Sequence, residues 1–431
     1  MNSLWTDTAK TESFNTLRGD TKTDILIIGG GIAGILCAYM LKKADADYIL
    51  IEADKICSGI TKNTTAKITS QHGFIYQKLI KEFNTDTARL YIDANQKAVK
   101  KYRELCENID CDFEEKSSFV FSEDERKIEK ELKALEKIGF TPKYVKDIPL
   151  PIKTAGAVQF EKQAQFHPLK FAYSISKGLN IFENTKVLEL KPGEAITNRG
   201  KIKAEKIIVA THFPILNKHG SYFLKMYQHR SYVIALKNAP KLNGMYVDEK
   251  DDGLSFRNYK DLLLLGGGGH RTGKKGGGWK ELENVAQTNL NGSSIEYKWA
   301  TQDCVTLDRV PYIGKYSKNI KELYVATGFN KWGMTSSMVA AEILTDMVLE
   351  KTNLYSEIFS PCRTILRPQL AINSIESVLN LITPTAPRCP HMGCALKYNK
   401  AEHSWDCPCH GSRFTKDGQL IDNPATDDIR L

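Results

Sequence analysis

Residues 24–52 read DILIIGGGIAGILCAYMLKKADADYILIE, and this stretch decides the fold. The apolar run at 25–28 is typical of a strand that is buried on both faces, and the apolar residues after it recur at helical spacing. Between strand and helix stands a G-x-G-x-x-G turn, formed by Gly29, Gly31 and Gly34. The first glycine permits a tight turn, the second lets a pyrophosphate approach the backbone, and the third lets the helix pack closely on the strand.

The second strand of this unit, at 48–51, ends at Glu52. A carboxylate at this distance from the glycines can bind a ribose hydroxyl, and the N–H groups at the helix N-terminus can bind phosphates. A glycine-rich turn without a ligand is the competing interpretation, but strand, helix, strand and acid are all in register. The stretch therefore predicts a dinucleotide-binding βαβ unit.

Two later segments extend this prediction. Residues 57–67, CSGITKNTTAK, are small and rich in hydroxyls, so they can pass close to a cofactor; a surface loop with helix-capping threonines is the alternative. The second segment has the same order of elements as the first motif. It predicts a buried strand at 323–326, a glycine-bearing turn at 327–335 and a helix at 336–349. The N-terminus of that helix can face an electron-rich cofactor atom, although an ordinary strand–helix connection has the same pattern.

Composition limits the function classes. The 431 residues can form two or three domains, and 42% hydrophobic with 26% charged residues is ordinary for a globular protein. The net charge of +9 is scattered, without a basic block interleaved with aromatics, so nucleic-acid binding is not expected. The sequence shows neither a membrane span nor a signal-peptide core, and six of its cysteines are dispersed as in reduced cytosolic proteins, so we expect a cytoplasmic protein.

The middle of the chain predicts a second domain. Charged, periodic segments predict helices at 86–108 and 123–139. Short β-like runs predict an antiparallel sheet with strands at 231–236, 254–257 and 262–265. The glycine clusters that follow, GGGGH and GKKGGG, do not fit a phosphate-binding loop, and we expect flexible turns there.

The most specific pattern lies near the C-terminus, where C-x-H and C-x-x-H are separated by fifteen residues. The residues are Cys389, His391, Cys407 and His410. Two cysteines can hold one iron of a [2Fe-2S] cluster and two histidines the other, while a zinc knuckle is the competing interpretation. Two further cysteines, 394 and 409, argue against zinc because they stand in CPHMGC and CPCHGS, which resemble the loops that carry the disulfide partners of Rieske proteins.

Taken together, the segments before this tail resemble the D-amino-acid oxidase, glycine oxidase and sarcosine oxidase superfamily of FAD proteins. The resemblance rests on GGGIAG with Glu52, SGITKNTTAK, IIVATHFP, DRVPYIG and YVATGFNKWGMT, and covers residues 22–350. It implies an α/β fold with a discontinuous Rossmann-like FAD-binding domain and an α+β substrate domain that contains an antiparallel sheet. The expected division is an arm at 1–22, an FAD-binding domain at 23–85, 151–215 and 300–352, a substrate domain at 86–150 and 216–299, a linker and helix at 353–386, and a cluster module at 387–431.

The resemblance also implies which residues contact FAD. The motif glycines would line the pyrophosphate, Glu52 the adenosine ribose and Val187 the adenine, while Gly333 and Met334 would offer N–H groups to the flavin N1–C2=O region. The implied set is Gly29, Gly31, Ile32, Ala33, Gly34, Glu52, Ala53, Ser58, Gly59, Thr64, Thr65, Ala66, Lys67, Val187, Ala210, Thr211, Gly328, Lys331, Trp332, Gly333, Met334 and Thr335.

The tail resembles a Rieske [2Fe-2S] module that is truncated to its cluster-binding loops. This resemblance implies that Cys394 and Cys409 form a disulfide between the two loops. Ser412 stands where relatives have a serine that hydrogen-bonds a cluster sulfide, and Phe414 stands where many have a tyrosine. With fewer hydrogen-bond donors to the cluster sulfurs, we expect an intermediate reduction potential for the cluster. Because the module is short, we also expect the flavoprotein surface or a partner to cover it.

The expected activity is that of a dehydrogenase. A small amine or amino-acid-like donor would reduce FAD, and electrons would leave through the cluster to an external acceptor, a protein or quinone-like molecule. Only one nucleotide motif is present, which favours an organic donor over NAD(P)H. Relatives often clamp a substrate carboxylate with an arginine before DRVPYIG, but here the counterpart is Asp303; nearby Cys304 could tether a flavin, although a structural thiol is the stronger interpretation.

Catalytic residues are poorly determined by the sequence. His72, Tyr232 and His270 are candidates, and for each a structural role is the stronger interpretation because polar groups beside glycine turns often satisfy the backbone. Two other functions remain open at this point. One is an electron-transfer or redox-sensing flavoprotein without its own substrate, and the other is a plain oxidase with a zinc-bound or vestigial tail.

Overall fold

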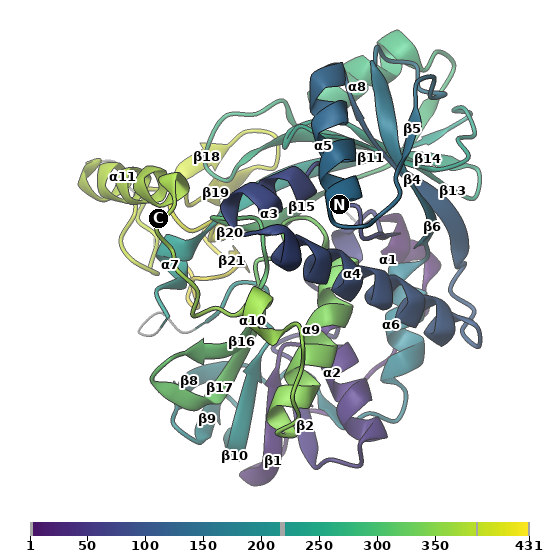
Figure 1. Cartoon of the computed structure of the whole chain (residues 1–431). Coiled ribbons are helices and arrows are strands. Elements are labelled where there is room, and N and C mark those ends of the chain that lie inside the picture. Colours follow the sequence, from purple (N-terminus) through teal and green to yellow (C-terminus); the bar gives the residue numbers. More distant parts are fainter. Residues whose placement is uncertain (1–2, 216–219, 385–386, 430–431) are drawn as a thin grey trace.

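The structure is a computed structural model that describes residues 3–215, 220–384 and 387–429, so positions 385–386 of the expected linker lie outside the described residues. Three sheets organise the chain (Figure 1). Among the described helices, none is both long and apolar enough to cross a membrane.

The first sheet carries the opening motif and has the order β16-β17-β10-β1-β2-β7, with β9 pairing β10, and β8 pairing β9. The strands β1, β2, β7, β10 and β17 run parallel, and a crossover helix returns the chain from the end of β1 to the start of β2. The strands are β1 (Thr21–Ile28), β2 (Tyr48–Ile51), β7 (Ile181–Phe182), β8 (Val187–Lys191), β9 (Glu194–Thr197), β10 (Gly200–Val209), β16 (Tyr312–Ser317) and β17 (Ile320–Thr327). Helices α2 (Ile32–Lys43), α6 (Pro168–Ser176) and α9 (Gly333–Val348) accompany this sheet.

The second sheet has the order β15-β11-β14-β13-β12-β4-β6-β3, with β5 pairing β6. Its strands are β3 (Lys67–Ile68), β4 (Glu114–Ser122), β5 (Lys143–Val145), β6 (Gly156–Gln165), β11 (Met226–Lys237), β12 (Met245–Asp248), β13 (Ser255–Tyr259), β14 (Leu262–Arg271) and β15 (Ser294–Thr306). Its helices are α3 (Tyr76–Glu82), α4 (Thr85–Cys106), α5 (Glu125–Lys137) and α8 (Gly278–Asn289).

The third sheet belongs to the C-terminal module and has the order β18-β19-β20-β21. Its strands are β18 (Lys397–Asn399), β19 (Ser404–Asp406), β20 (Arg413–Thr415) and β21 (Leu420–Asp422). Helix α10 (Ser356–Phe359) and helix α11 (Pro368–Ile382) connect the first sheet to this module, and α7 (Tyr222–Lys225) lies beside them (Figure 1).

Three details differ from the sequence-based expectations. The arm expected at 1–22 contains a helix that packs into the core, because α1 (Leu4–Thr8) buries Leu4 and Trp5, and the Trp5 indole N–H donates to Thr64 O at 2.7 Å. Strands β3, β6 and β15 pair in the second sheet, although the bounds 23–85, 151–215 and 300–352 expected for the FAD-binding domain include β3, β6 and the end of β15. The GGGGH cluster is not a turn but part of β14.

The glycines of β14 are explained by close packing. A Cβ on Gly268 would lie 2.4 Å from Gly278 O at the start of α8, and Gly268 has a φ of +58°. A Cβ on Gly269 would lie 2.7 Å from the ring of His229 on the neighbouring strand. The strand therefore needs glycine where a helix start and a histidine ring press against its backbone.

Candidate functional site

A cavity of about 950 Å³ lies where the three sheets meet. Its walls come from the carboxyl ends of β1, β2 and β10, from the hydroxyl-rich segment, from the turn before α9 and from β11 of the second sheet. The C-terminal module also lines it, through Leu420, Ile421, Asp422, Asn423, Ala425 and Thr426. Segments that are far apart in sequence thus form one binding site.

The glycine turn has the geometry that the sequence predicted. Gly29 has a φ of +112°, and a Cβ there would lie 2.6 Å from Ala210 O. A Cβ on Gly34 would lie 2.0 Å from Gly29 O, so only glycine lets α2 start so close to β1. Gly31 faces open space apart from the Thr61 hydroxyl at 3.5 Å, which leaves room for a phosphate to approach the backbone.

Glu52 lies at the end of β2 and lines the same cavity. Its carboxylate accepts hydrogen bonds from Gly30 N at 2.7 Å and Asp54 N at 3.0 Å. Burial raises the pKa of this carboxyl, and the backbone donors partly oppose that shift. Each carboxylate oxygen has a second lone pair, so the side chain can also accept from a ribose hydroxyl.

Most residues that the resemblance assigned to FAD line this cavity. They are Gly29, Gly31, Ile32, Ala33, Glu52, Ala53, Ser58, Gly59, Thr64, Thr65, Lys67, Val187, Ala210, Thr211, Gly328, Lys331, Trp332, Gly333 and Met334. Gly34, Ala66 and Thr335 do not line it. The open glycine turn, the acid and the cavity volume together fit an extended dinucleotide such as FAD.

His72 lines the cavity, but other side chains hold its ring. Its Nδ1 lies 2.7 Å from the Tyr91 hydroxyl, and its Nε2 lies 2.9 Å from both Thr69 O and the Thr335 hydroxyl. The ring also stacks on Trp332 at a centroid distance of 5.0 Å. Burial lowers the pKa of His72 to about 3, so the imidazole is neutral and positions the turn before α9.

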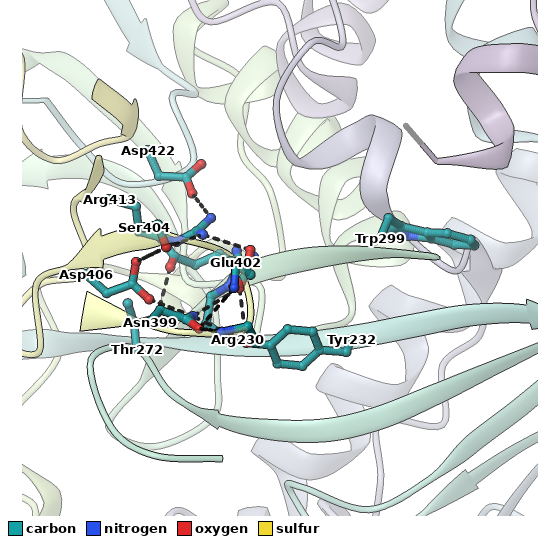
Figure 2. A network of polar contacts seen from close by, with 12 residues as sticks. Arg230, Tyr232, Thr272, Trp299, Asn399, Glu402, Ser404, Asp406, Arg413 and Asp422 are labelled. Carbon is teal, nitrogen blue, oxygen red and sulfur yellow. Dashed lines mark hydrogen bonds and ion pairs between the residues drawn. The ribbon is translucent and has the colours of Figure 1, made fainter. Parts of the chain in front are cut away.

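Tyr232 belongs to a polar network that reaches the C-terminal module (Figure 2), and His270 contacts Tyr232. The Tyr232 hydroxyl lies 3.0 Å from His270 Nε2 and donates to Glu402 Oε1 at 3.0 Å. Tyr232 itself lines the cavity, whereas His270 does not. The network therefore links a wall of the cavity to the turn between β18 and β19.

Glu402 is the centre of this network. Arg230 and Arg413, both nearly fully buried, pair with its carboxylate, and Arg413 also pairs with Asp406 at 3.0 Å. Burial alone would raise the pKa of Glu402, but the two guanidinium groups outweigh it and hold that pKa below its usual value. Arg230 comes from β11 and Glu402 from the module, so this buried pair fastens one to the other.

A second group of charges lines the cavity; the sequence pointed to Lys331 and Asp303 separately, but not to His212 or to the grouping of the three. Asp303, His212 and Lys331 lie in the cavity wall. Burial raises the pKa of Asp303, whereas burial lowers the pKa values of His212 and Lys331. No sequence pattern links these three positions, because they come from β15 and from the segments after β10 and β17.

The two cysteine–histidine loops have matching backbones. The N–H of Gly393 donates to Cys389 O at 2.8 Å, and that of Gly411 donates to Cys407 O at 2.9 Å. Both glycines have positive φ, +75° and +85°. Each loop thus reverses tightly, which brings its cysteine and its histidine to the same end of the module.

The predicted cluster ligands meet there. The rings of His391 and His410 lie 4.9 Å apart. Both ring nitrogens of His410 are buried without a hydrogen-bond partner, and burial lowers the pKa of His410 to about 4, which keeps it neutral as a ligand must be. A hydrogen bond between the Cys389 and Cys407 thiols lowers the pKa of Cys407, so these sulfurs are adjacent. Two adjacent thiols and two neutral imidazoles fit a [2Fe-2S] cluster.

The two additional cysteines lie beside this group. The sulfur atoms of Cys394, Cys407 and Cys409 lie within 4.8 Å of one another. Cys394 and Cys409 are free thiols in the structure, so the predicted disulfide is not formed here and stays a prediction.

Comparisons with known proteins agree with this geometry. Residues 24–347 match the family model for FAD dependent oxidoreductases, and residues 379–431 match the Rieske [2Fe-2S] domain model. The chain is 36% identical over 490 aligned residues to YhfW of Bacillus subtilis (strain 168), named as a Rieske 2Fe-2S iron-sulfur protein, covering 98% of this chain and 95% of that protein. It is 23% identical to gamma-glutamylputrescine oxidoreductase of Escherichia coli (strain K12), covering 78% and 85%.

Solved structures show the same fold for the larger part of the chain. Glycine oxidase from Geobacillus kaustophilus has a TM-score of 0.67 at 19% identity, covering 80% of this chain and 99% of that one. L-proline dehydrogenase from P. horikoshii has a TM-score of 0.67 at 17% identity, covering 79% and 97%. The chain therefore belongs to the FAD dependent oxidoreductase family and carries a C-terminal Rieske [2Fe-2S] domain.

Proposed function

We propose that the protein is a cytoplasmic FAD-dependent dehydrogenase of a small amine or amino-acid-like substrate. When bound, FAD would accept a hydride from that substrate, and the [2Fe-2S] cluster would deliver electrons singly to an external protein or quinone-like acceptor. The observation that supports this proposal best is that the Rieske module forms part of the wall of the flavin cavity. An oxidase that hands both electrons to oxygen has no need of such a neighbour.

A short covalent and hydrogen-bonded connection joins cavity and cluster loop. Thr301 and Asp303 on β15 line the cavity, and the residue between them, Gln302, is fully buried. The Gln302 side-chain amide donates to Gly411 O at 2.9 Å, and Gly411 follows the cluster ligand His410 directly in sequence. The Gln302 amide oxygen in turn accepts from Thr272 at 2.9 Å, which fixes the side chain. This contact holds the second cluster loop at a constant position relative to the cavity.

The cavity wall supports an amine better than a carboxylate as the recognised group. Asp303 stands where relatives place a substrate-clamping arginine, and it presents a buried carboxyl to the cavity. Arg309 also lines the cavity, but Asp251 and the Tyr227 hydroxyl already bind its guanidinium. The relative from Escherichia coli is named for an amine substrate, gamma-glutamylputrescine. We therefore expect a substrate whose amino group is recognised by an acid.

Anaerobic reduction by a panel of small substrates tests the proposal. The holoprotein is mixed with amines, amino acids and hydroxy acids, and flavin bleaching is followed together with the cluster EPR signal. An amine should bleach the flavin and then generate the cluster signal. Cys407→Ser should still bleach but give no cluster signal, while Cys362→Ser, a thiol far from the cluster loops in sequence, should behave as the natural chain.

Two results would contradict the proposal. If no small molecule reduces the flavin but a reduced carrier protein does, the chain is an electron-transfer protein. If substrate bleaches the flavin and only oxygen reoxidises it, with no cluster signal at any stage, the chain is a plain oxidase.

A further inference from the structure

The C-terminal module contributes a segment to the flavin cavity that the family resemblance does not account for. Residues 420–426 comprise β21 and the turn after it, and among them Leu420, Ile421, Asp422, Asn423, Ala425 and Thr426 line the cavity. Two of them contact the FAD-binding half, since Asn423 bonds to Thr211 and Thr426 bonds to Lys186, the sequence neighbour of Val187. The segment therefore lies at the end of the cavity where the sequence places the adenosine part of FAD.

Direct hydrogen bonds hold this segment on the FAD-binding half. The Asn423 side-chain amide donates to Thr211 O and to Phe213 O, both at 2.8 Å. The Lys186 ammonium group donates to Thr426 O at 2.7 Å. Thr211 and Lys186 both line the cavity, so the segment is bonded to the rim of the site that it closes.

The same segment is bonded to the second cluster loop. The Ala425 N–H donates to the Ser412 hydroxyl oxygen at 3.0 Å, and the Ser412 carbonyl accepts from the N–H of the ligand Cys407 at 2.8 Å. Arg413, the next residue, pairs with Asp422 at 3.0 Å. Ser412 and Ala425 are both buried, so this connection is shielded from water. Two hydrogen bonds thus separate a cluster ligand from the wall of the FAD site.

We propose that residues 420–426 are part of the FAD-binding site and that, through Ser412, they couple FAD affinity to the integrity of the Rieske cluster loops. The segment closes the adenosine end of the cavity, so FAD stabilises the docked module and the docked module retains FAD. By linkage the two effects are equal in magnitude. A chain whose cluster loops are disordered would release FAD more readily. A chain that cannot pass electrons to a cluster would therefore not stay loaded with FAD.

FAD titration of the full-length chain tests the proposal. FAD is removed from anaerobically purified protein and titrated back, and the Kd is measured from quenching of FAD fluorescence. Asn423→Ala loses two hydrogen bonds at the rim, so the Kd should rise about tenfold, while the cluster EPR signal stays unchanged. Lys416→Ala, an exposed substitution on the turn between β20 and β21, is the matched control and should leave the Kd unchanged. An unchanged Kd in Asn423→Ala would overturn the assignment of this segment to the site.

Two further measurements keep the proposal falsifiable if Asn423→Ala folds poorly. In the natural chain, amide hydrogen exchange at 420–426 should slow when FAD is added, and exchange that does not respond to FAD would contradict the proposal. Ser412→Ala removes the acceptor of the Ala425 N–H, so it should both change the cluster signal and raise the Kd for FAD. A changed cluster signal with an unchanged Kd would show that cluster loop and FAD site are not coupled.

Discussion

Single residues in this protein connect parts of the chain that the sequence does not relate. The sequence predicts sites at the glycine motif, Glu52 and the cysteine–histidine pairs, because the spacing of such motifs within one segment is fixed by the group that they would bind. Glu402 could not, because its partners Arg230 and Tyr232 are about 170 residues away and follow no local pattern. Residues that bind a common ligand leave a pattern in the sequence, and residues that bind each other across domains do not.

Glu402→Gln should weaken the attachment of the module. Two buried arginines would then face a neutral amide, and the free energy of unfolding should fall by about 3 kcal/mol. Urea denaturation measures this change, and Asp417→Asn on an exposed turn of the same module is the control. If Glu402→Gln lowers the free energy of unfolding no more than Asp417→Asn does, the network does not fasten the module.

His72→Gln should make the protein less sensitive to acid. The pKa of His72 is about 3 in the folded chain against an ordinary value of 6.5, so between these values the unfolded chain binds a proton that the folded chain does not. Stability therefore falls as the pH drops from 6.5 toward 3, and one such group contributes a slope of about 1.4 kcal/mol per pH unit.

The pH dependence of the unfolding free energy measures that contribution. In His72→Gln, the number of protons taken up on unfolding between pH 6.5 and pH 3 should be lower by about one than in the natural chain. His403→Gln, which changes an exposed histidine, is the control and should retain the slope of the natural chain. An identical slope in all three proteins would contradict a buried, neutral His72.

At the scale of elements, predictions succeeded where periodicity and turn chemistry agree. The helices expected at 86–108 and 336–349 appear as α4 and α9, and the strands of the antiparallel sheet appear as β11, β13 and β14. The GGGGH cluster was wrongly interpreted as a turn because a glycine run signals backbone freedom, whereas here it serves close packing under α8. Sheet membership of β6 depends on pairing with distant strands, which a single sequence does not reveal.

Gly34→Ala tests the contact between α2 and β1. The added methyl group would lie 2.0 Å from Gly29 O, so helix and strand must separate. We expect a loss of about 1–3 kcal/mol in unfolding free energy and a large loss of FAD affinity. For the free energy of unfolding, Gly59→Ala is the matched control, since the Cβ added at Gly59 meets nothing within 4 Å. Equal effects of both substitutions would contradict the packing role of Gly34.

Helix α11 exposes its apolar side chains and buries polar ones, which is the reverse of an ordinary amphipathic helix. Its buried residues are Asn373 and Asn380, whereas Ile372, Ile375 and Ile382 are at least half exposed. Arg271 donates to the Asn373 amide oxygen at 3.0 Å, and the Asn373 amide donates to Leu224 O at 3.2 Å. Polar contacts rather than apolar burial therefore hold this helix on the protein.

A pair of substitutions on α11 checks this inverted arrangement. Ile375→Ser should change the free energy of unfolding by less than about 0.5 kcal/mol, because the side chain is already exposed. Asn373→Ala should cost about 1–3 kcal/mol, because Arg271 and Leu224 O lose a buried partner. The opposite order in urea denaturation would show that the apolar side faces the protein.

At the scale of the whole molecule, the flavin domain, the second sheet and the Rieske module share one cavity. The sequence predicted two cofactors and their ligands but not their mutual position, because that position depends on side chains such as Gln302, Glu402 and Asn423 that contact other domains. The prediction that the short module needs a covering surface agrees with its docking onto β11 and β15.

The most direct test of the account is low-temperature EPR with metal analysis of anaerobically purified, reduced full-length protein. The account predicts about two irons per chain and a rhombic Rieske-type signal that is lost in Cys407→Ser and retained in Cys362→Ser. The same signal should appear when the flavin is reduced photochemically without any added substrate, because the buried Gln302 side chain connects the cavity wall on β15 to the second cluster loop. Stoichiometric zinc with no iron signal, or a cluster that stays oxidised beside a fully reduced flavin, would contradict it.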